Sequence, residues 1–230
     1  MKNRTGRSSL GPWAPATLAS MWTLALETTS PRASLALIED DTVRLERALS
    51  PGHYATELLS EVAAALAAQQ LRLEDVDLFA VADGPGSFTG VRIGLTAVKG
   101  WIEALQRPAA AVSTLRAAAG AGPALAALDA GRGEVYYGVY PAGAADAGAA
   151  AAEEGVEPRA DFERRLATLA WPARTPDAGL REAFPQLQPS PACLAAAVGR
   201  LGVADFQRGA RRTALDLDAR YLRRPDAVPW

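Results

Sequence analysis

The residues that could do chemistry concentrate in a glycine-rich stretch between an apolar run at 77–82 and a helical pattern that continues to Gln106. A strand, a glycine-rich turn and a helix can together present backbone N–H groups to a phosphate. However, Gly90 is followed by Val and Arg rather than by the Lys-Ser or Lys-Thr of a Walker loop, and the glycine spacing does not fit the dinucleotide fingerprint. We therefore interpret the glycines as permitting close packing at a tight turn. The stretch reads Gly84-Pro85-Gly86-Ser87-Phe88-Thr89-Gly90-Val91-Arg92-Ile93-Gly94.

Histidine and cysteine, which serve most often in nucleophilic and metal chemistry, each occur once. The single His53 cannot build a histidine-rich metal site, and a Ser-His-Asp triad would have to run through it. The single Cys193 excludes an intramolecular disulfide and fits a reducing cytosol, and its alanine-rich surroundings favour a small core residue over a nucleophile. The net charge of −2 gives no electrostatic case for a stand-alone nucleic-acid binder. No apolar run approaches the length that spans a membrane.

The helix predicted after the glycine-rich turn carries two apolar faces. The first has the spacing of a core stripe and consists of Val91, Leu95, Val98, Ile102 and Leu105. The second consists of Gly90, Ile93, Gly94, Ala97, Trp101 and Ala104. Because a helix that serves one core shows one stripe, we expect burial on two sides, either inside one domain or with the second face against a partner protein.

The chain divides into an N-terminal extension and two lobes. Residues 1–20 lack periodicity and an apolar signal-peptide core, so we expect a disordered or mis-called extension with Met21 as the true start. The first lobe, 21–120, is predicted to contain strands at 22–27, 33–38 and 42–49, a helix at 54–70, a strand at 77–82, the long helix and a strand at 109–112. This βββαβαβ order predicts a mixed sheet covered by helices.

The second lobe, 121–230, is expected to be smaller. It opens with strands at 124–129 and 134–140, which repeat the strand–turn–strand opening of the first lobe. Residues 141–160 are rich in alanine and glycine and predict a variable loop. A helix is predicted at 161–169, mostly irregular chain at 171–189, and a helix at 190–201, while the tail 217–224 is expected to lie along the surface.

Several motifs together are similar to those of one bacterial protein family. Besides the glycine-rich stretch they are Leu24-Ala25-Leu26-Glu27-Thr28-Thr29, Gly52-His53, Val112-Ser113-Thr114-Leu115, the run Leu-Asp-Ala-Gly-Arg-Gly-Glu-Val-Tyr at 128–136, and Tyr221-Leu222-Arg223. With these motifs the chain resembles the TsaB (YeaZ) family of tRNA threonylcarbamoyladenosine biosynthesis accessory proteins. The resemblance covers residues 21–140 and then the tail, and Glu27 stands where the family more usually has Asp.

The resemblance implies an α/β fold of two RNase H-like lobes, as in the actin, sugar-kinase and Hsp70 superfamily. It also implies a cytoplasmic subunit that pairs with TsaD, the catalytic paralogue that modifies N6 of adenosine 37 in tRNA. The resemblance further implies that TsaE, an ATPase, completes the assembly and that the chain contacts tRNA only indirectly, through the complex. The catalytic paralogue carries a His-x-x-x-His metal pair where this chain has Thr114 and Ala118, so we expect a non-catalytic subunit without a metal or another cofactor.

Candidate site residues follow from the resemblance together with the helix pattern. Because family members pair through helices of the first lobe, the predicted interface residues are Leu58, Val62, Ile93, Ala97 and Trp101, with ordinary core positions as the alternative for each. Two turns correspond to the phosphate-contacting turns of the superfamily and are predicted as vestigial nucleotide turns: Glu27 with Thr28, and Asp129. Four arginines are either tRNA contacts in the complex or solvated charges: Arg132, Arg220, Arg223 and Arg224.

Other functions stay open at this level. The chain can be a stand-alone enzyme, either a metal-dependent peptidase or a small kinase of the same superfamily. The missing histidine pair argues against the first, and the small second lobe argues against the second. It can also be a homodimeric scaffold that uses the same helices against a second copy. A homodimer in isolation would not exclude the subunit function, because such surfaces often self-associate when the true partner is absent.

Overall fold

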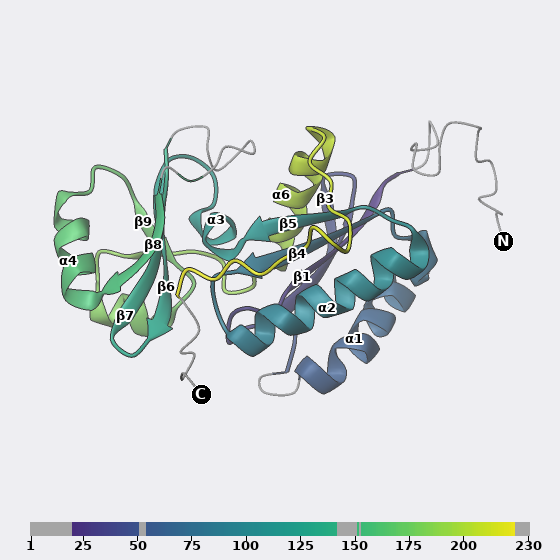
Figure 1. The fold of residues 1–230 in the computed structure, drawn as a ribbon, viewed down its shortest axis with the longest axis horizontal. Coiled ribbons are helices and arrows are strands. Elements are labelled where there is room, and N and C mark those ends of the chain that lie inside the picture. Colours follow the sequence, from purple (N-terminus) through teal and green to yellow (C-terminus); the bar gives the residue numbers. More distant parts are fainter. Residues whose placement is uncertain (1–19, 51–53, 142–150, 152, 224–230) are drawn as a thin grey trace.

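Two sheets, one in each lobe, organise the protein (Figure 1). The computed structural model describes residues 20–50, 54–141, 151 and 153–223. In this part of the chain each sheet has five strands, in the order β3-β2-β1-β4-β5 in the first lobe and β10-β9-β6-β7-β8 in the second. The expected α/β class with two mixed sheets is confirmed, whereas the second sheet is not reduced in its number of strands. No helix among the described residues is long and apolar enough to cross a membrane.

The first lobe has the predicted βββαβαβ order. Its elements are β1 (Trp22–Glu27), β2 (Ser34–Glu39), β3 (Thr42–Ala48), α1 (Tyr54–Ala68), a short 3-10 turn (Leu73–Asp75), β4 (Leu78–Gly84), α2 (Phe88–Leu105) and β5 (Ala109–Ser113). The strands β1, β2 and β3 form an antiparallel meander, and β4 and β5 extend the sheet in parallel from β1. The helices α1 and α2 cover one face, and α6 (Ala195–Gln207) covers the other (Figure 1).

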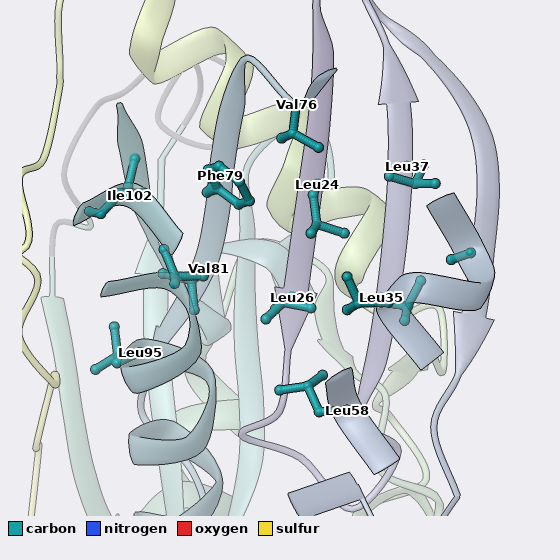
Figure 2. Packing of buried hydrophobic residues seen from close by; sticks show 14 of the residues in the cluster. Leu24, Leu26, Leu35, Leu37, Leu58, Val76, Phe79, Val81, Leu95 and Ile102 are labelled. Atoms are coloured by element: carbon teal, nitrogen blue, oxygen red, sulfur yellow. The ribbon is translucent and has the colours of Figure 1, made fainter. Parts of the chain in front are cut away.

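Side-chain size differs between the two faces of this sheet, and the alternation of side chains along a strand explains how. Leu24, Leu26 and Val81 point toward α1 and α2 and form a leucine-rich core (Figure 2). Their neighbours Ala25, Ala36 and Ala80 belong to a second cluster, which includes residues of α6. The small side chains let α6 approach the sheet closely: a Cβ atom at Gly202 would lie 2.7 Å from the Cβ atom of Ala80.

The second lobe places its own core between its sheet and two short helices. The elements are α3 (Thr114–Ala119), β6 (Ala124–Gly131), β7 (Glu134–Tyr140), β8 (Glu153–Pro158), α4 (Arg159–Thr168), β9 (Ala173–Thr175), α5 (Ala178–Ala183) and β10 (Gln188–Pro189). Phe162 of α4 meets Phe184, which follows α5, edge to face with ring centroids 5.3 Å apart. Together with the inward residues of β6 and β7 they form the core of this lobe.

Several expectations for the second half of the chain were wrong. The predicted loop 141–160 contains β8, which pairs antiparallel with β7, and two of its acidic residues, Glu153 and Glu157, form ion pairs with Arg165 of α4. The stretch 171–189 contains β9, α5 and β10 instead of mostly irregular chain. The last helix begins at Ala195 rather than at residue 190, and it packs on the first sheet although the range 121–230 was expected to form the second lobe.

Candidate functional site

The glycine-rich turn packs tightly on the turn that follows β1. A Cβ atom at Gly90 would lie 1.9 Å from the carbonyl oxygen of Thr28, and one at Gly86 would lie 2.4 Å from that of Thr29. Real Cβ atoms essentially never come this close to a carbonyl oxygen, so these positions require glycine. The hydroxyl of Thr28 also donates to the carbonyl of Gly90, at 2.7 Å. The sequence-based interpretation of these glycines as packing positions is therefore confirmed.

Ser87 and its neighbours begin α2 rather than form a phosphate loop. Ser87 is the N-cap residue, and its hydroxyl accepts a hydrogen bond from the backbone N–H of Gly90 at 3.2 Å. The preceding Gly84–Pro85 peptide bond is cis. Thr89 lies exposed in the first turn of the helix. The motif thus positions the N-terminal end of α2 on the end of β1.

Glu27 fills the turn that was predicted as a vestigial nucleotide turn. Its carboxylate accepts hydrogen bonds from the backbone N–H groups of Thr29 and Ser30, at 2.6 and 2.9 Å, and from both of their hydroxyls at 2.6 Å. The Glu27 residue is fully buried. These N–H groups, which an anionic ligand would need, are therefore bound by a carboxylate of the same chain. Asp129, the other predicted turn residue, is exposed and accepts from the N–H of Gly131 at 3.0 Å, at the end of β6.

The outer face of α1 and α2 holds part of the predicted interface set. Ile93, Ala97 and Trp101 are partly exposed and border the leucine-rich core. In contrast, Leu58 and Val62 are each 3% exposed and lie inside that core, so the expectation that they face a partner is wrong. They were misassigned because the pattern of α1 does not separate its buried side from its alanine-rich outer side.

Leu59 is an interface candidate that was not predicted from the sequence. Its residue is 64% exposed on α1, and it neighbours the buried Leu58 in sequence. The signal that could have singled it out is the i, i+4, i+8 row that it forms with Ala63 and Ala67.

The positions aligned with the metal pair of the catalytic paralogue are buried in α3. The hydroxyl of Thr114 lies 2.9 Å from that of Thr29, and Ala118 is fully buried. A hydroxyl held in this way and a methyl group offer no imidazole to a metal. Among the described residues, no group of three His, Cys, Asp or Glu side chains could hold a metal ion. His53 lies outside the described residues, as do Arg224 and the extension 1–19.

Comparison with known proteins agrees with this geometry. A family model described as TsaD, tRNA N6-adenosine threonylcarbamoyltransferase, matches residues 49–175. The solved structure of YeaZ from Pseudomonas aeruginosa is 31% identical, covers 88% of this chain and 100% of its own, and superposes with a TM-score of 0.72. The chain belongs to the TsaB/YeaZ family.

A curated TsaB/YeaZ relative carries a pathway name. The Escherichia coli tRNA threonylcarbamoyladenosine biosynthesis protein TsaB is 38% identical over 124 residues, which is 51% of this chain and 54% of the E. coli protein. The match therefore spans about half the length of that relative. A component of (R)-2-hydroxyglutaryl-CoA dehydratase from Acidaminococcus fermentans is 8% identical with a TM-score of 0.51, a likeness that speaks for the fold alone.

A polar cluster between the lobes of this TsaB/YeaZ-family chain was not found from the sequence. Asp83 is the next-to-last residue of β4, and its carboxylate lies 3.4 Å from Nε of Arg220. Nη1 of Arg220 lies 3.1 Å from Glu154 of β8. Burial raises the pKa of Asp83 to about 6, and the charge of Arg220 offsets only part of this effect. Burial, with the nearby charge of Glu154, also raises the pKa of Tyr140. These residues lie far apart in the chain, so no local pattern joins them.

Arginines and exposed aromatic residues of the C-terminal tail make specific contacts with both lobes. Arg220 belongs to the polar cluster, and Arg223 pairs with Glu134 of β7, so neither is a plain solvated charge. Near the start of α2, Phe88 stacks on Tyr221 with ring centroids 5.3 Å apart. The guanidinium of Arg92 lies 3.9 Å from the centre of the Phe88 ring. The C-terminal tail, expected along the surface, is therefore tied into the fold.

Proposed function

We propose that this chain is a non-catalytic subunit of the bacterial complex that makes N6-threonylcarbamoyladenosine in tRNA, and that it binds a TsaD-type catalytic subunit through the outer face of α1 and α2. The observation that carries the proposal is the composition of this face. Among residues 59–68 of α1, the exposed positions carry no charge: they are Leu59, Ser60, Ala63, Ala64, Ala67 and Ala68. On α2, a single i, i+4, i+7, i+11 row consists of Ile93, Ala97, Gly100 and Ala104.

Such a face suits a helical partner better than water. The solvent side of a surface helix is normally charged or polar, whereas the exposed positions of α1 between Leu59 and Ala68 are mostly alanine. Small side chains permit another pair of helices to pack at an interaxial distance of about 8–10 Å. Gly100 supports this argument, since glycine inside a helix costs about 1 kcal/mol relative to alanine and a Cβ atom there would meet nothing within 4 Å. Leu59 is the large apolar side chain that would anchor the contact.

The non-catalytic role is supported by what stands where the paralogue has metal ligands. Thr114 and Ala118 supply a hydroxyl that contacts Thr29 and a buried methyl group. The turn after β1 is likewise closed by Glu27, which supports the absence of a nucleotide cofactor at that turn. We accordingly propose that the chemistry belongs to the catalytic subunit, that a TsaE-type ATPase joins the complex in the cytoplasm, and that tRNA is met through the assembly.

The test is to mix the chain with the catalytic subunit from the same source and to measure the mass of the complex and its Kd. Leu59→Glu and Ile93→Glu should each weaken pairing by 2 kcal/mol or more, about 30-fold in Kd, because each places a charge in an apolar contact. Circular dichroism should show that both variants remain folded, because neither the Leu59 nor the Ile93 side chain is fully buried. Trp171→Glu, at a 37% exposed aromatic outside α1 and α2, is the matched control and should leave Kd unchanged.

The competing assignments give different results. If no complex forms although both proteins are folded, the subunit role is wrong and a homodimeric scaffold or an independent activity becomes the better account. A homodimer of the chain alone that Leu59→Glu disrupts is compatible with the proposal, because an apolar face can pair with itself when its partner is absent. Equal loss of pairing in the control variant would remove α1 and α2 as the binding face.

A further inference from the structure

The segment 212–223 crosses from the first lobe to the second, and we call it the strap. It begins beside β5, where the N–H of Arg212 donates to the carbonyl of Ala109 at 2.8 Å. Leu217 is then fully buried in the leucine-rich core. In Figure 1 the strap is the yellow chain that runs from beyond α6 across β4 toward the second lobe. Its far end is held there by the ion pair between Arg223 and Glu134 of β7.

Arg220 of the strap sits between carboxylates of the two lobes. Its backbone N–H donates to the carbonyl of Asp83 at 2.7 Å, and its side chain contacts the Asp83 carboxylate of the first lobe. Its Nη1 lies 3.1 Å from Glu154 of the second lobe. Glu154 also accepts from the hydroxyl of Ser113, at the end of β5, at 2.7 Å, and from Tyr140 at 2.5 Å. One junction between the lobes is therefore polar and is centred on Arg220 and Glu154.

A second junction between the lobes is apolar and contains α3. All six residues of α3 are buried. The cluster around α3 joins Ala82 and Val112 of the first sheet to Leu128 and Tyr136 of the second. This contact consists largely of small side chains and contains no ion pair of the strap, although Leu222 of the strap packs against it and Tyr140 is shared with the polar junction. Loss of the ion pairs of Arg220 removes none of the contacts within this cluster.

We propose that the strap is a clamp that holds the two lobes together through Arg220, and that the lobes separate about α3 when this clamp is removed. The side chains of Asp83 and Glu154 are 9% and 10% exposed. Without Arg220 they become two buried carboxylates facing each other across the junction. Two carboxylates that have lost their common counterion and most of their water either repel each other or require one of them, Asp83, to take up a proton, and opening the junction to water relieves both costs.

The strap also connects this junction to α2. Tyr221, next to Arg220, stacks on Phe88 in the first turn of α2, and its hydroxyl accepts from Nε of Arg92 at 3.3 Å. The two exposed rings therefore serve as each other's partner and hold the strap on the helix. A change in the clamp reaches the N-terminal end of α2 through this stack.

The test measures the distance between the lobes by pulsed EPR. Spin labels are placed at Glu103→Cys on α2 and Ala167→Cys on α4, both exposed, in a Cys193→Ser background. The clamp predicts one narrow distance distribution for this protein. Arg220→Ala should shift the mean to longer distance and broaden the distribution. Arg44→Ala is the control, because it removes an ion pair within the first lobe, Arg44–Glu39 at 2.8 Å, and its side chain is 47% exposed against 45% for Arg220.

A second variant keeps the test decisive if Arg220→Ala does not fold. Glu154→Gln removes the charge on the second lobe but keeps a side chain of the same size that can still accept from Ser113. It should also shift the mean to longer distance and broaden the distribution, but less than Arg220→Ala does, because Arg220 keeps its ion pair with Asp83. Distributions equal to that of the Arg44→Ala control, in whichever of the two variants are folded, would overturn the clamp.

Discussion

Glycines on one helix should respond oppositely to the same substitution. A Cβ atom at Gly90 would lie 1.9 Å from the carbonyl oxygen of Thr28, whereas one at Gly100 would meet nothing within 4 Å. Gly100→Ala should therefore gain most of the helix-propensity difference, about 0.8–1 kcal/mol. Gly90→Ala gains less helix propensity, because Gly90 lies near the N-cap. Its new Cβ atom must also displace the backbone carbonyl of Thr28 by more than 1 Å. Overpacking of this kind costs about 1–3 kcal/mol or more, so we expect a net loss of about 2 kcal/mol.

The assay is thermal and urea unfolding of the two variants beside the parent protein. For a chain of this length 1 kcal/mol shifts Tm by about 2–4 °C, so Gly100→Ala should raise Tm by about 2–4 °C and Gly90→Ala should lower it by about 4–8 °C. Gly90→Ala should also lower the protection of the α2 amides against hydrogen exchange, because the N-terminal end of the helix no longer packs closely on Thr28. Equal Tm values for the two variants, or a stabilised Gly90→Ala, would refute the close-packing account of the glycine-rich turn.

Four further substitutions test other parts of the structure. The pKa of Asp83 is about 6 in the folded protein against 3.8 for an ordinary aspartate, so its contribution to stability is present below about pH 4 and is lost as the pH rises through 6. Relative to Asp83→Asn, the free energy of unfolding of the parent should therefore fall by up to about 3 kcal/mol between pH 4 and pH 7. A difference that does not change with pH would contradict the raised pKa. Glu27→Ala, which leaves buried N–H groups unpaired, should cost about 3 kcal/mol or more in urea unfolding. Leu217→Ala should cost about 2–5 kcal/mol, and a change below 1 kcal/mol would mean that the strap is not part of the core. Gly199→Ala should destabilise the protein because its Cβ atom would lie 2.3 Å from Cδ1 of Ile38, whereas an unchanged Tm would show that α6 can move away.

Local patterns in the sequence predicted much of the first lobe. The strand at 22–27 has the predicted bounds, and the helices α1 and α2 differ from prediction by a few residues at their ends. Apolar alternation and helical periodicity are properties of short windows, so they can be seen without the fold. The second lobe was harder because β8 is made of residues that usually signal a loop. Glu153 and Glu157 lie in a strand that pairs with β7, and both form ion pairs with Arg165 of α4, contacts that a short window of sequence does not show.

The candidate site could be predicted only where local chemistry determines it. The glycine-rich turn and its packing role were visible in the sequence, although the group that Gly90 packs on, the carbonyl of Thr28, was not. The assignment of Leu58 as an interface residue failed because the outer side of α1 is as apolar as its inner side, so periodicity has no polar face against which to orient it. The cluster of Asp83, Glu154 and Arg220 depends on contacts across 66 or more residues, which only the tertiary structure brings together.

Glu27 makes the turn after β1 a poor binding site for a phosphate. A phosphate placed there would need the N–H groups of Thr29 and Ser30, and these already donate to the Glu27 carboxylate at 2.6 and 2.9 Å. Displacing it would leave a buried carboxylate without its donors, which costs several kcal/mol before any contact to the phosphate is made. The same carboxylate fixes the turn on which Gly90 and Gly94 are seated. The turn after β1 therefore positions α2, the helix that carries part of the proposed partner-binding face.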